Sequence, residues 1–145
     1  MSHTTAITDI VFVDIAALKL AITDLNKQGV KCDLREKATP RAYSANQQGM
    51  GPADYVLHLD NSKYDVGFYM DTQKKGYVAK TDFYGGDIQR LLGVPQPKGA
   101  YKPQAMMGKL YQSYGVHATT RAAALKGYST QKIVKEDGTI QLVLQ

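Results

Sequence analysis

The chain has 145 residues, 43% of them hydrophobic and 21% charged, with one cysteine and a formal net charge of +5. A chain of this length fits one domain, residues 1–145, that buries roughly two-thirds of its unfolded surface. The single cysteine excludes an internal disulfide, and no apolar run approaches the ~18 residues that span a bilayer. The first residues lack the basic-then-apolar order of a secretion signal, so we expect a soluble, cytoplasmic protein with no membrane partner.

The opening of the chain predicts a strand, a helix and a second strand. Residues 7–13 indicate a strand, and Asp14 is placed to cap the helix that follows. Apolar residues recur at helical spacing as far as Leu25, and Gly29 suits the left-handed position after a helix. Residues 30–36 return to extended structure. If the two strands were parallel neighbours, the helix would cross between them in the right-handed sense.

The middle of the chain predicts antiparallel strands. Residues 39–52 form a long loop, with a short strand as one option at 41–43. Residues 53–70 contain two runs of alternating apolar side chains on either side of a polar turn, which predicts a β-hairpin. A turn at 71–76 and a third run at 77–83 extend this hairpin to a three-stranded meander.

The second half of the chain predicts two helices separated by a loop. Asp87 is placed to cap a short helix that ends near Leu92. Residues 94–103 contain three prolines and predict an extended loop. A long helix follows from Pro103, with a kink or break as one option at Gly115. The apolar stripe of this helix comprises Met107, Leu110, Tyr111, Tyr114, Ala118, Ala122 and Leu125.

The C-terminus predicts a second hairpin. Asp137-Gly138 favours a two-residue type I′ turn, which would place Lys135 opposite Ile140 and Ile133 opposite Leu142. Together the elements predict the α+β class: a single domain with one antiparallel-rich sheet, an early short helix and a long late helix packed on one face.

Several short motifs are shared with one known family. They are Met1-Ser2-His3, the helix led by Asp14, Arg41-Ala42-Tyr43, Ala53-Asp54-Tyr55-Val56, Tyr64-Asp65-Val66-Gly67-Phe68, Asp82-Phe83-Tyr84-Gly85, the pair Tyr114 and His117, and Asp137-Gly138-Thr139-Ile140. On these motifs the chain resembles the Ycf35-like family, also called DUF1257, of small plastid, cyanobacterial, bacterial and phage proteins. It departs from that pattern in an apparent insertion at 94–102 and in phenylalanine and tyrosine where tryptophan is common. The family has no established activity, so the resemblance implies a fold and no reaction.

The histidines and acidic residues give no metal-binding motif. His3, His58 and His117 are far apart in the sequence, and neither His-x-x-x-His nor Cys-x-x-Cys spacing occurs. His58 alternates with apolar neighbours, which places it on the outer side of the central hairpin. We therefore expect no metal and no cofactor.

One pair of side chains could take part in catalysis. Tyr114 and His117 are three residues apart on one helix and share a face. With Asp82 or Asp65 they could form a Tyr–His–Asp network. The favoured interpretation is that Tyr114 packs on the sheet and His117 hydrogen-bonds nearby backbone, so the sequence predicts no enzyme.

Charge is distributed unevenly along the chain. Residues 1–36 carry a net −1, whereas residues 73–135 carry eleven Lys or Arg against two Asp, a net of +9. Tyrosines lie among these cations, as at surfaces that anchor proteins or bind nucleic acids. The candidate binding residues are Arg41, Tyr43, Lys74, Lys75, Tyr77, Tyr101, Lys102, Lys109, Tyr114, His117 and Arg121.

Two functions follow as hypotheses from this pattern. The first is a non-enzymatic interaction module that binds a protein or macromolecular complex through Tyr-, Lys- and Arg-rich loops. The alternative is binding of nucleic acid, or of a small anionic nucleotide-like ligand, on the basic C-terminal half.

Overall fold

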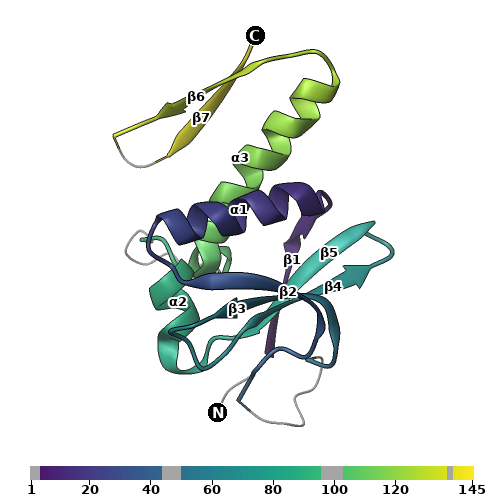
Figure 1. Cartoon of the computed structure of the whole chain (residues 1–145), viewed down its shortest axis with the longest axis vertical. Coiled ribbons are helices and arrows are strands. Elements are labelled where there is room, and N and C mark those ends of the chain that lie inside the picture. Colours follow the sequence, from purple (N-terminus) through teal and green to yellow (C-terminus); the bar gives the residue numbers. More distant parts are fainter. Residues whose placement is uncertain (1–3, 44–49, 96–102, 137–138) are drawn as a thin grey trace.

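The computed structural model describes residues 4–43, 50–95, 103–136 and 139–145. Within them the chain forms a five-stranded antiparallel sheet, a separate two-stranded hairpin and three α-helices (Figure 1). The predicted α+β class is therefore confirmed. No helix in the described residues has the length and apolar character that crossing a bilayer requires. The elements are β1 (Thr4–Phe12), α1 (Ile15–Lys27), β2 (Cys32–Ala38), β3 (Ala53–Leu59), β4 (Val66–Asp71), β5 (Gly76–Asp82), α2 (Asp87–Leu92), α3 (Gly108–Leu125), β6 (Thr130–Val134) and β7 (Ile140–Leu144), with 3-10 segments at Tyr84–Gly86 and Pro103–Met107.

The sheet has the strand order β1-β5-β4-β3-β2. Its last four strands form a continuous antiparallel meander, one strand longer than the predicted one, because β2 pairs with β3. β1 pairs antiparallel with β5, so β1 and β2 occupy opposite edges of the sheet. Helix α1 therefore does not cross between neighbouring parallel strands. Residues 41–43 form no strand.

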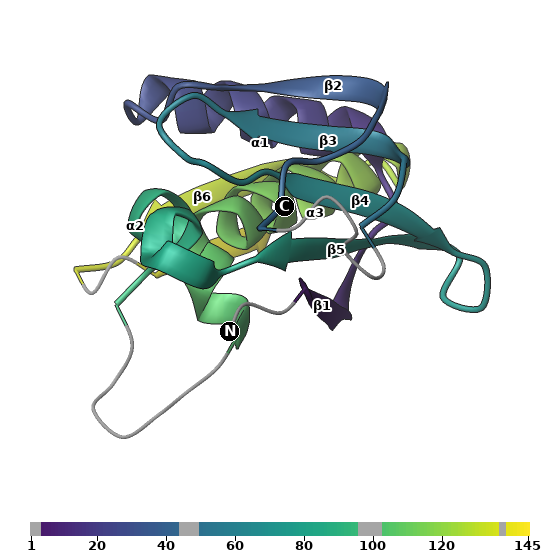
Figure 2. The same ribbon diagram turned by 90° about the horizontal axis from the view of Figure 1, so that it is seen from below.

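The main core lies between one face of the sheet and the helices α1 and α3 (Figures 1 and 2). Phe12 is fully buried there, and its ring lies 5.1 Å from that of Phe68, 5.4 Å from that of Tyr111 and 4.7 Å from that of Tyr114. Aromatic pairs at this spacing add to the free energy of apolar burial. One ring at the end of β1 thus joins the sheet to α3.

Helix α1 has the predicted boundaries. The side chain of Asp14 accepts a hydrogen bond from the backbone N–H of Ala17 at 3.1 Å and caps the helix. Gly29 has a φ of +93°, the left-handed conformation expected just after the helix. Leu18 and Leu25 are fully buried on the face turned to the core.

Part of the second face of the sheet is covered by the described ends of the β2–β3 connection. Val56 and Met50 are each 2% exposed, although Val56 alternates with core residues and faces away from the helices. Gly67, opposite Val56 in the register, makes room for this cover. A Cβ at Gly67 would lie 2.6 Å from Tyr69 Cε2 and 3.1 Å from Pro40 Cγ. Both faces of the central hairpin are therefore buried in part.

The buried carboxylate of Asp65 anchors this cover. Arg41 donates from Nη2 to Asp65 Oδ1 at 2.7 Å, from Nε at 3.1 Å and from its backbone N–H to Oδ2 at 2.9 Å. The Asp65 side chain is 4% exposed. These hydrogen bonds raise the pKa of Arg41 despite partial burial of the guanidinium, so the guanidinium stays charged.

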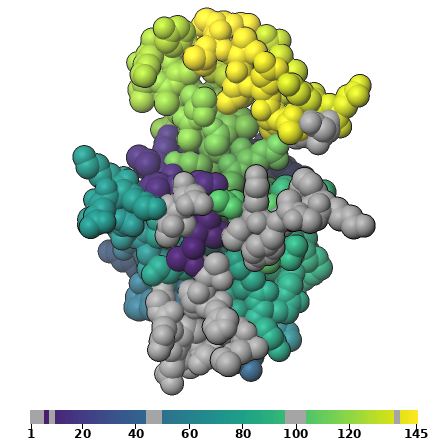
Figure 3. All heavy atoms as spheres, turned by 180° about the vertical axis from the view of Figure 1, so that it is seen from behind, coloured from purple at the N-terminus to yellow at the C-terminus, as the bar shows by residue number. Residues whose placement is uncertain are grey.

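Helix α3 is continuous through Gly115, so the helix does not break at this glycine, which was one option from the sequence. The predicted apolar stripe holds only in its first half. Leu110 and Tyr114 are buried, whereas Ala122 is exposed and Leu125 is 90% exposed. The second half of α3 and the β6–β7 hairpin form a lobe at one end of the molecule (Figure 3). We call residues 116–136 and 139–145 the arm.

The predicted register of the C-terminal hairpin is wrong by one residue. Val134 pairs with Ile140 and Lys132 with Leu142, and the Lys135 N–H donates to the Thr139 carbonyl at 2.8 Å. Three residues therefore separate Lys135 from Thr139, whereas the predicted turn has two residues. The predicted type I′ turn at 137–138 lies outside the described residues, as does most of the predicted loop at 94–103.

Substitution of Arg41 should destabilise the fold. Arg41→Ala leaves a buried carboxylate short of its charged donor, which we expect to lower the free energy of unfolding by about 2–3 kcal/mol. Arg35→Ala is the matched control, because its ion pair with Asp33 is about half exposed on both sides. That change should cost less than about 0.5 kcal/mol. Urea denaturation measures both, and equal losses would contradict the anchoring role of Asp65.

Candidate functional site

The sequence-predicted binding residues fall in separate parts of the fold. Arg41 and Tyr43 lie in the β2–β3 connection, Lys74 and Lys75 in the β4–β5 turn, and Tyr77 on β5. Tyr101 and Lys102 lie outside the described residues. The remaining four, Lys109, Tyr114, His117 and Arg121, follow one another along α3.

The tyrosines of the first group make contacts within the protein. Tyr43 packs edge-to-face against Tyr84, with ring centroids 5.1 Å apart. Tyr77 packs edge-to-face against Tyr55, and its hydroxyl donates to Asp54 at 3.2 Å. Burial and this hydrogen bond raise the pKa of Tyr77. These rings therefore support the outer parts of the sheet.

Two residues of α3 hold the start of α1. The hydroxyl of Tyr114 accepts hydrogen bonds from the backbone N–H groups of Val13 at 2.8 Å and Asp14 at 3.1 Å. Arg121 Nε donates to Asp14 Oδ2 at 2.8 Å. The hydrogen bond from Arg121 lowers the pKa of Asp14. Tyr114 and Arg121 thus serve helix packing, and their polar groups are already paired.

The proposed catalytic network does not form. His117 Nε2 lies 2.6 Å from Asp24 Oδ2, whereas Asp82 accepts backbone N–H groups from Tyr43 and Tyr84. The predicted interpretation of His117 as a partner of nearby backbone is also wrong, because its partner is a carboxylate 93 residues away in sequence. The sequence could not indicate this contact, because it depends on how α1 and α3 pack.

Asp24 also accepts a hydrogen bond from Ser113. The Ser113 Oγ lies 2.7 Å from Asp24 Oδ2, the same oxygen that contacts His117. Burial raises the pKa of Asp24, but the hydrogen bonds from Ser113 and His117 outweigh burial and lower it. A nucleophilic serine would need to contact the histidine rather than its carboxylate. Asp24, Ser113 and His117, which we call the polar clasp, therefore join α1 to α3 and do not have the geometry of an activated serine.

This clasp lines a cleft of about 330 Å³ between α1, α3 and the β6–β7 hairpin, which we call the helix–hairpin cleft. The hydroxyl oxygen of Thr130 is buried there and has no hydrogen-bond partner among the described residues. The cleft is lined by Asp24, Gln28, Lys109, Gln112, Ser113, Val116, His117, Thr120, Thr130, Lys132 and Ile140.

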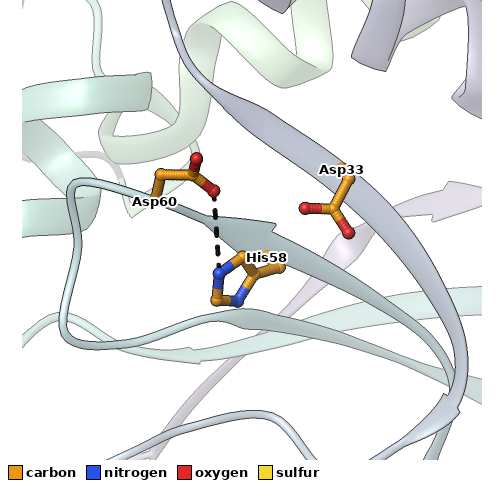
Figure 4. Close-up of side chains that lie close together, drawn as sticks. All are labelled: Asp33, His58 and Asp60. Carbon is orange, nitrogen blue, oxygen red and sulfur yellow. Dashed lines mark ion pairs between the residues drawn. The ribbon is translucent and has the colours of Figure 1, made fainter.

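A second group of polar side chains was missed by sequence reasoning. Asp33 on β2 lies directly opposite His58 on β3 in the strand register, and Asp60 follows two residues after His58. Their candidate ligand atoms all lie within 4.8 Å of one another (Figure 4). His-x-Asp is a weak signal on its own, and the third residue is supplied only by the pairing of β2 with β3.

The chain was compared with known proteins at three levels. No protein-family model, no curated protein and no solved structure matches it. The resemblance to the Ycf35-like family therefore stays a prediction.

The Asp14–Arg121 pair should make stability depend on pH. Because the folded-state pKa of Asp14 is below its ordinary value of 3.8, its ionised form stabilises the fold above that pH. Asp14→Asn keeps a capping side chain but removes the charge, so we expect a loss of up to about 1 kcal/mol at neutral pH. The difference should shrink as the pH falls below about 3.8 and through the lower folded pKa.

Thermal denaturation at several pH values measures this difference. Arg121→Gln is the partner control, because adding it to Asp14→Asn should cost little more than either change alone. A loss that is independent of pH, or fully additive with that of Arg121→Gln, would contradict the pairing.

Proposed function

We propose that the protein is a non-enzymatic interaction module that binds a protein partner through the arm. The observation that supports this is the exposure of large apolar side chains there. Among the described residues ten large hydrophobic side chains are exposed, and half of them lie on the arm. These five are Leu125 (90%), Tyr128 (50%), Ile133 (38%), Val134 (63%) and Leu144 (53%). Exposed apolar side chains that gather in one part of a fold are typical of protein-binding surfaces.

The shape of the arm supports the same proposal. A shallow, mostly apolar groove of about 550 Å³ lies between α3 and the hairpin, with Ala118, Ala122, Tyr128 and Leu144 in its lining. Within the described residues, β6 and β7 each have a strand neighbour on one side only. A two-stranded hairpin is marginal by itself, and its open edges can accept a strand from a partner.

The charges of the arm favour an acidic partner. Its described cations are Arg121, Lys126, Lys132 and Lys135, against Glu136 as the described acidic side chain. Arg121 is already paired with Asp14, but Lys126 lines the apolar groove, Lys132 lies on β6 of the open hairpin and Lys135 directly follows β6. The partner that fits is a protein segment with apolar side chains flanked by Asp or Glu.

Leu125→Ser and Leu144→Ser should abolish partner binding while leaving the fold intact. Both side chains are exposed, so each change should alter stability by less than about 0.5 kcal/mol. Met70→Ser is the matched control, because Met70 is 49% exposed but lies on the sheet. Affinity capture followed by titration of the purified partner gives the dissociation constants. Capture of the chain alone, or equal binding by all three variants, would contradict the proposal.

A second candidate function is binding of a small anionic ligand in the helix–hairpin cleft. Lys109, Lys132 and His117 line this cleft together with Thr130, whose hydroxyl has no hydrogen-bond partner among the described residues. Cations and free hydroxyls together suit a phosphate group. A cleft of about 330 Å³ fits one nucleotide-like molecule better than a nucleic acid strand.

Calorimetry with a nucleoside monophosphate, and with inorganic phosphate for comparison, tests this candidate. Lys109→Ala and Lys132→Ala should each weaken binding about tenfold, since each removes a charge-assisted contact. Lys135→Ala is the control, because it removes an arm lysine that does not line the cleft. Binding should also weaken with rising salt. Equal affinity in all three variants, or no binding by the unmodified chain, would exclude the cleft.

A further inference from the structure

We propose that Asp33, His58 and Asp60 form a surface site for a divalent transition-metal ion of the Zn²⁺ or Co²⁺ type. Asp33 on β2 and His58 on β3 lie on neighbouring strands, on the side of the sheet that faces away from the helices, and Asp60 follows the end of β3. Figure 4 shows the two carboxylates flanking the imidazole of His58. The proposal goes beyond the arm and the helix–hairpin cleft, and shares no residue with either.

Cross-strand pairing positions the first two ligands. Asp33 and His58 are direct partners in the antiparallel register of β2 and β3, so their side chains point to the same side. Asp60 follows His58 by two residues, and His58 Nε2 lies 3.7 Å from Asp60 Oδ1. All three ligand atoms thus converge on one side of two hydrogen-bonded strands.

A carboxylate outside the proposed site contacts the other ring nitrogen of His58. His58 Nδ1 lies 3.2 Å from the carboxylate oxygen Oδ1 of Asp65, which is buried and held by Arg41. This contact occupies Nδ1, and Nε2 is the ring nitrogen that lies near Asp60. Metal-binding histidines are oriented in the same way by a carboxylate on the other ring nitrogen.

The distances allow coordination after a small movement of the aspartates. Ligand atoms around a tetrahedral Zn²⁺ lie about 3.4 Å apart, given metal–ligand bonds of about 2.1 Å. The three groups here lie within 4.8 Å of one another. The side chains of Asp33 and Asp60 are 52% and 54% exposed, so each can rotate by the required amount. Water would complete the coordination on the open side.

The donor set selects the class of ion. One imidazole and two carboxylates suit Zn²⁺, Co²⁺ and their neighbours in the first transition row better than Mg²⁺ or Ca²⁺, which prefer oxygen alone. Arg35 competes with the ion for one of the three proposed ligands. Arg35 Nε donates to Asp33 Oδ2 at 2.9 Å, so the ion would have to displace this exposed ion pair. The cost is small because surface ion pairs contribute little.

Calorimetric titration of the full chain with ZnCl₂, repeated with CoCl₂ and read by visible absorption, tests the proposal. We expect one ion per chain. His58→Gln and Asp60→Asn should each weaken binding at least about tenfold, because each removes one of three ligands. Arg35→Ala should tighten binding severalfold, because it frees Asp33.

His117→Gln is the matched control. His117 also contacts an aspartate, but this pair offers two ligating groups rather than three. Its substitution should leave the affinity unchanged, and Asp60→Asn, at an exposed position, keeps the fold for the comparison. No binding by the unmodified chain, equal binding by His58→Gln, or loss of binding on His117→Gln alone would overturn the proposal.

Discussion

The carboxylate of Asp65 is the constraint on which the outer face of the sheet depends. It is almost fully buried, and it is acceptable there because its oxygens receive the guanidinium and backbone N–H of Arg41. The backbone carbonyl of the same residue accepts the buried hydroxyl of Thr81 on β5 at 2.9 Å. Its carboxylate also contacts the imidazole of His58. One residue therefore fixes a long connection, a neighbouring strand and a histidine ring.

Most of the polar side chains on α3 that the sequence identified as candidate binding residues form contacts between α1 and α3. Tyr114 binds two backbone N–H groups, Arg121 pairs with Asp14, and His117 with Asp24. Their donors and acceptors stabilise the packing of two helices that are about 100 residues apart in the chain. The binding surfaces that we propose on this side are therefore the helix–hairpin cleft and the arm.

The arm buries its large apolar side chains less completely than the rest of the molecule does. In the rest of the described chain, which we call the body, the sheet and two helices bury Phe12, Leu18 and Phe68 completely. In the arm, a half-helix and two strands enclose too little volume to bury their own apolar surface, and Leu125 projects into solvent. A partner that covered this surface would gain the free energy of apolar burial that the arm cannot obtain alone.

The sequence by itself determined the local elements. Asp14 and Gly29 mark both ends of α1, and the alternation in residues 53–70 identifies the central hairpin, because these signals depend on near neighbours in the chain. Tertiary structure decided which elements meet. It placed β1 beside β5, Asp33 opposite His58, and the second half of α3 away from the body. Periodicity shows that a helix or strand has an apolar face, but only packing selects the element that covers it. The candidate sites therefore arise from contacts between distant segments, which no local pattern specifies.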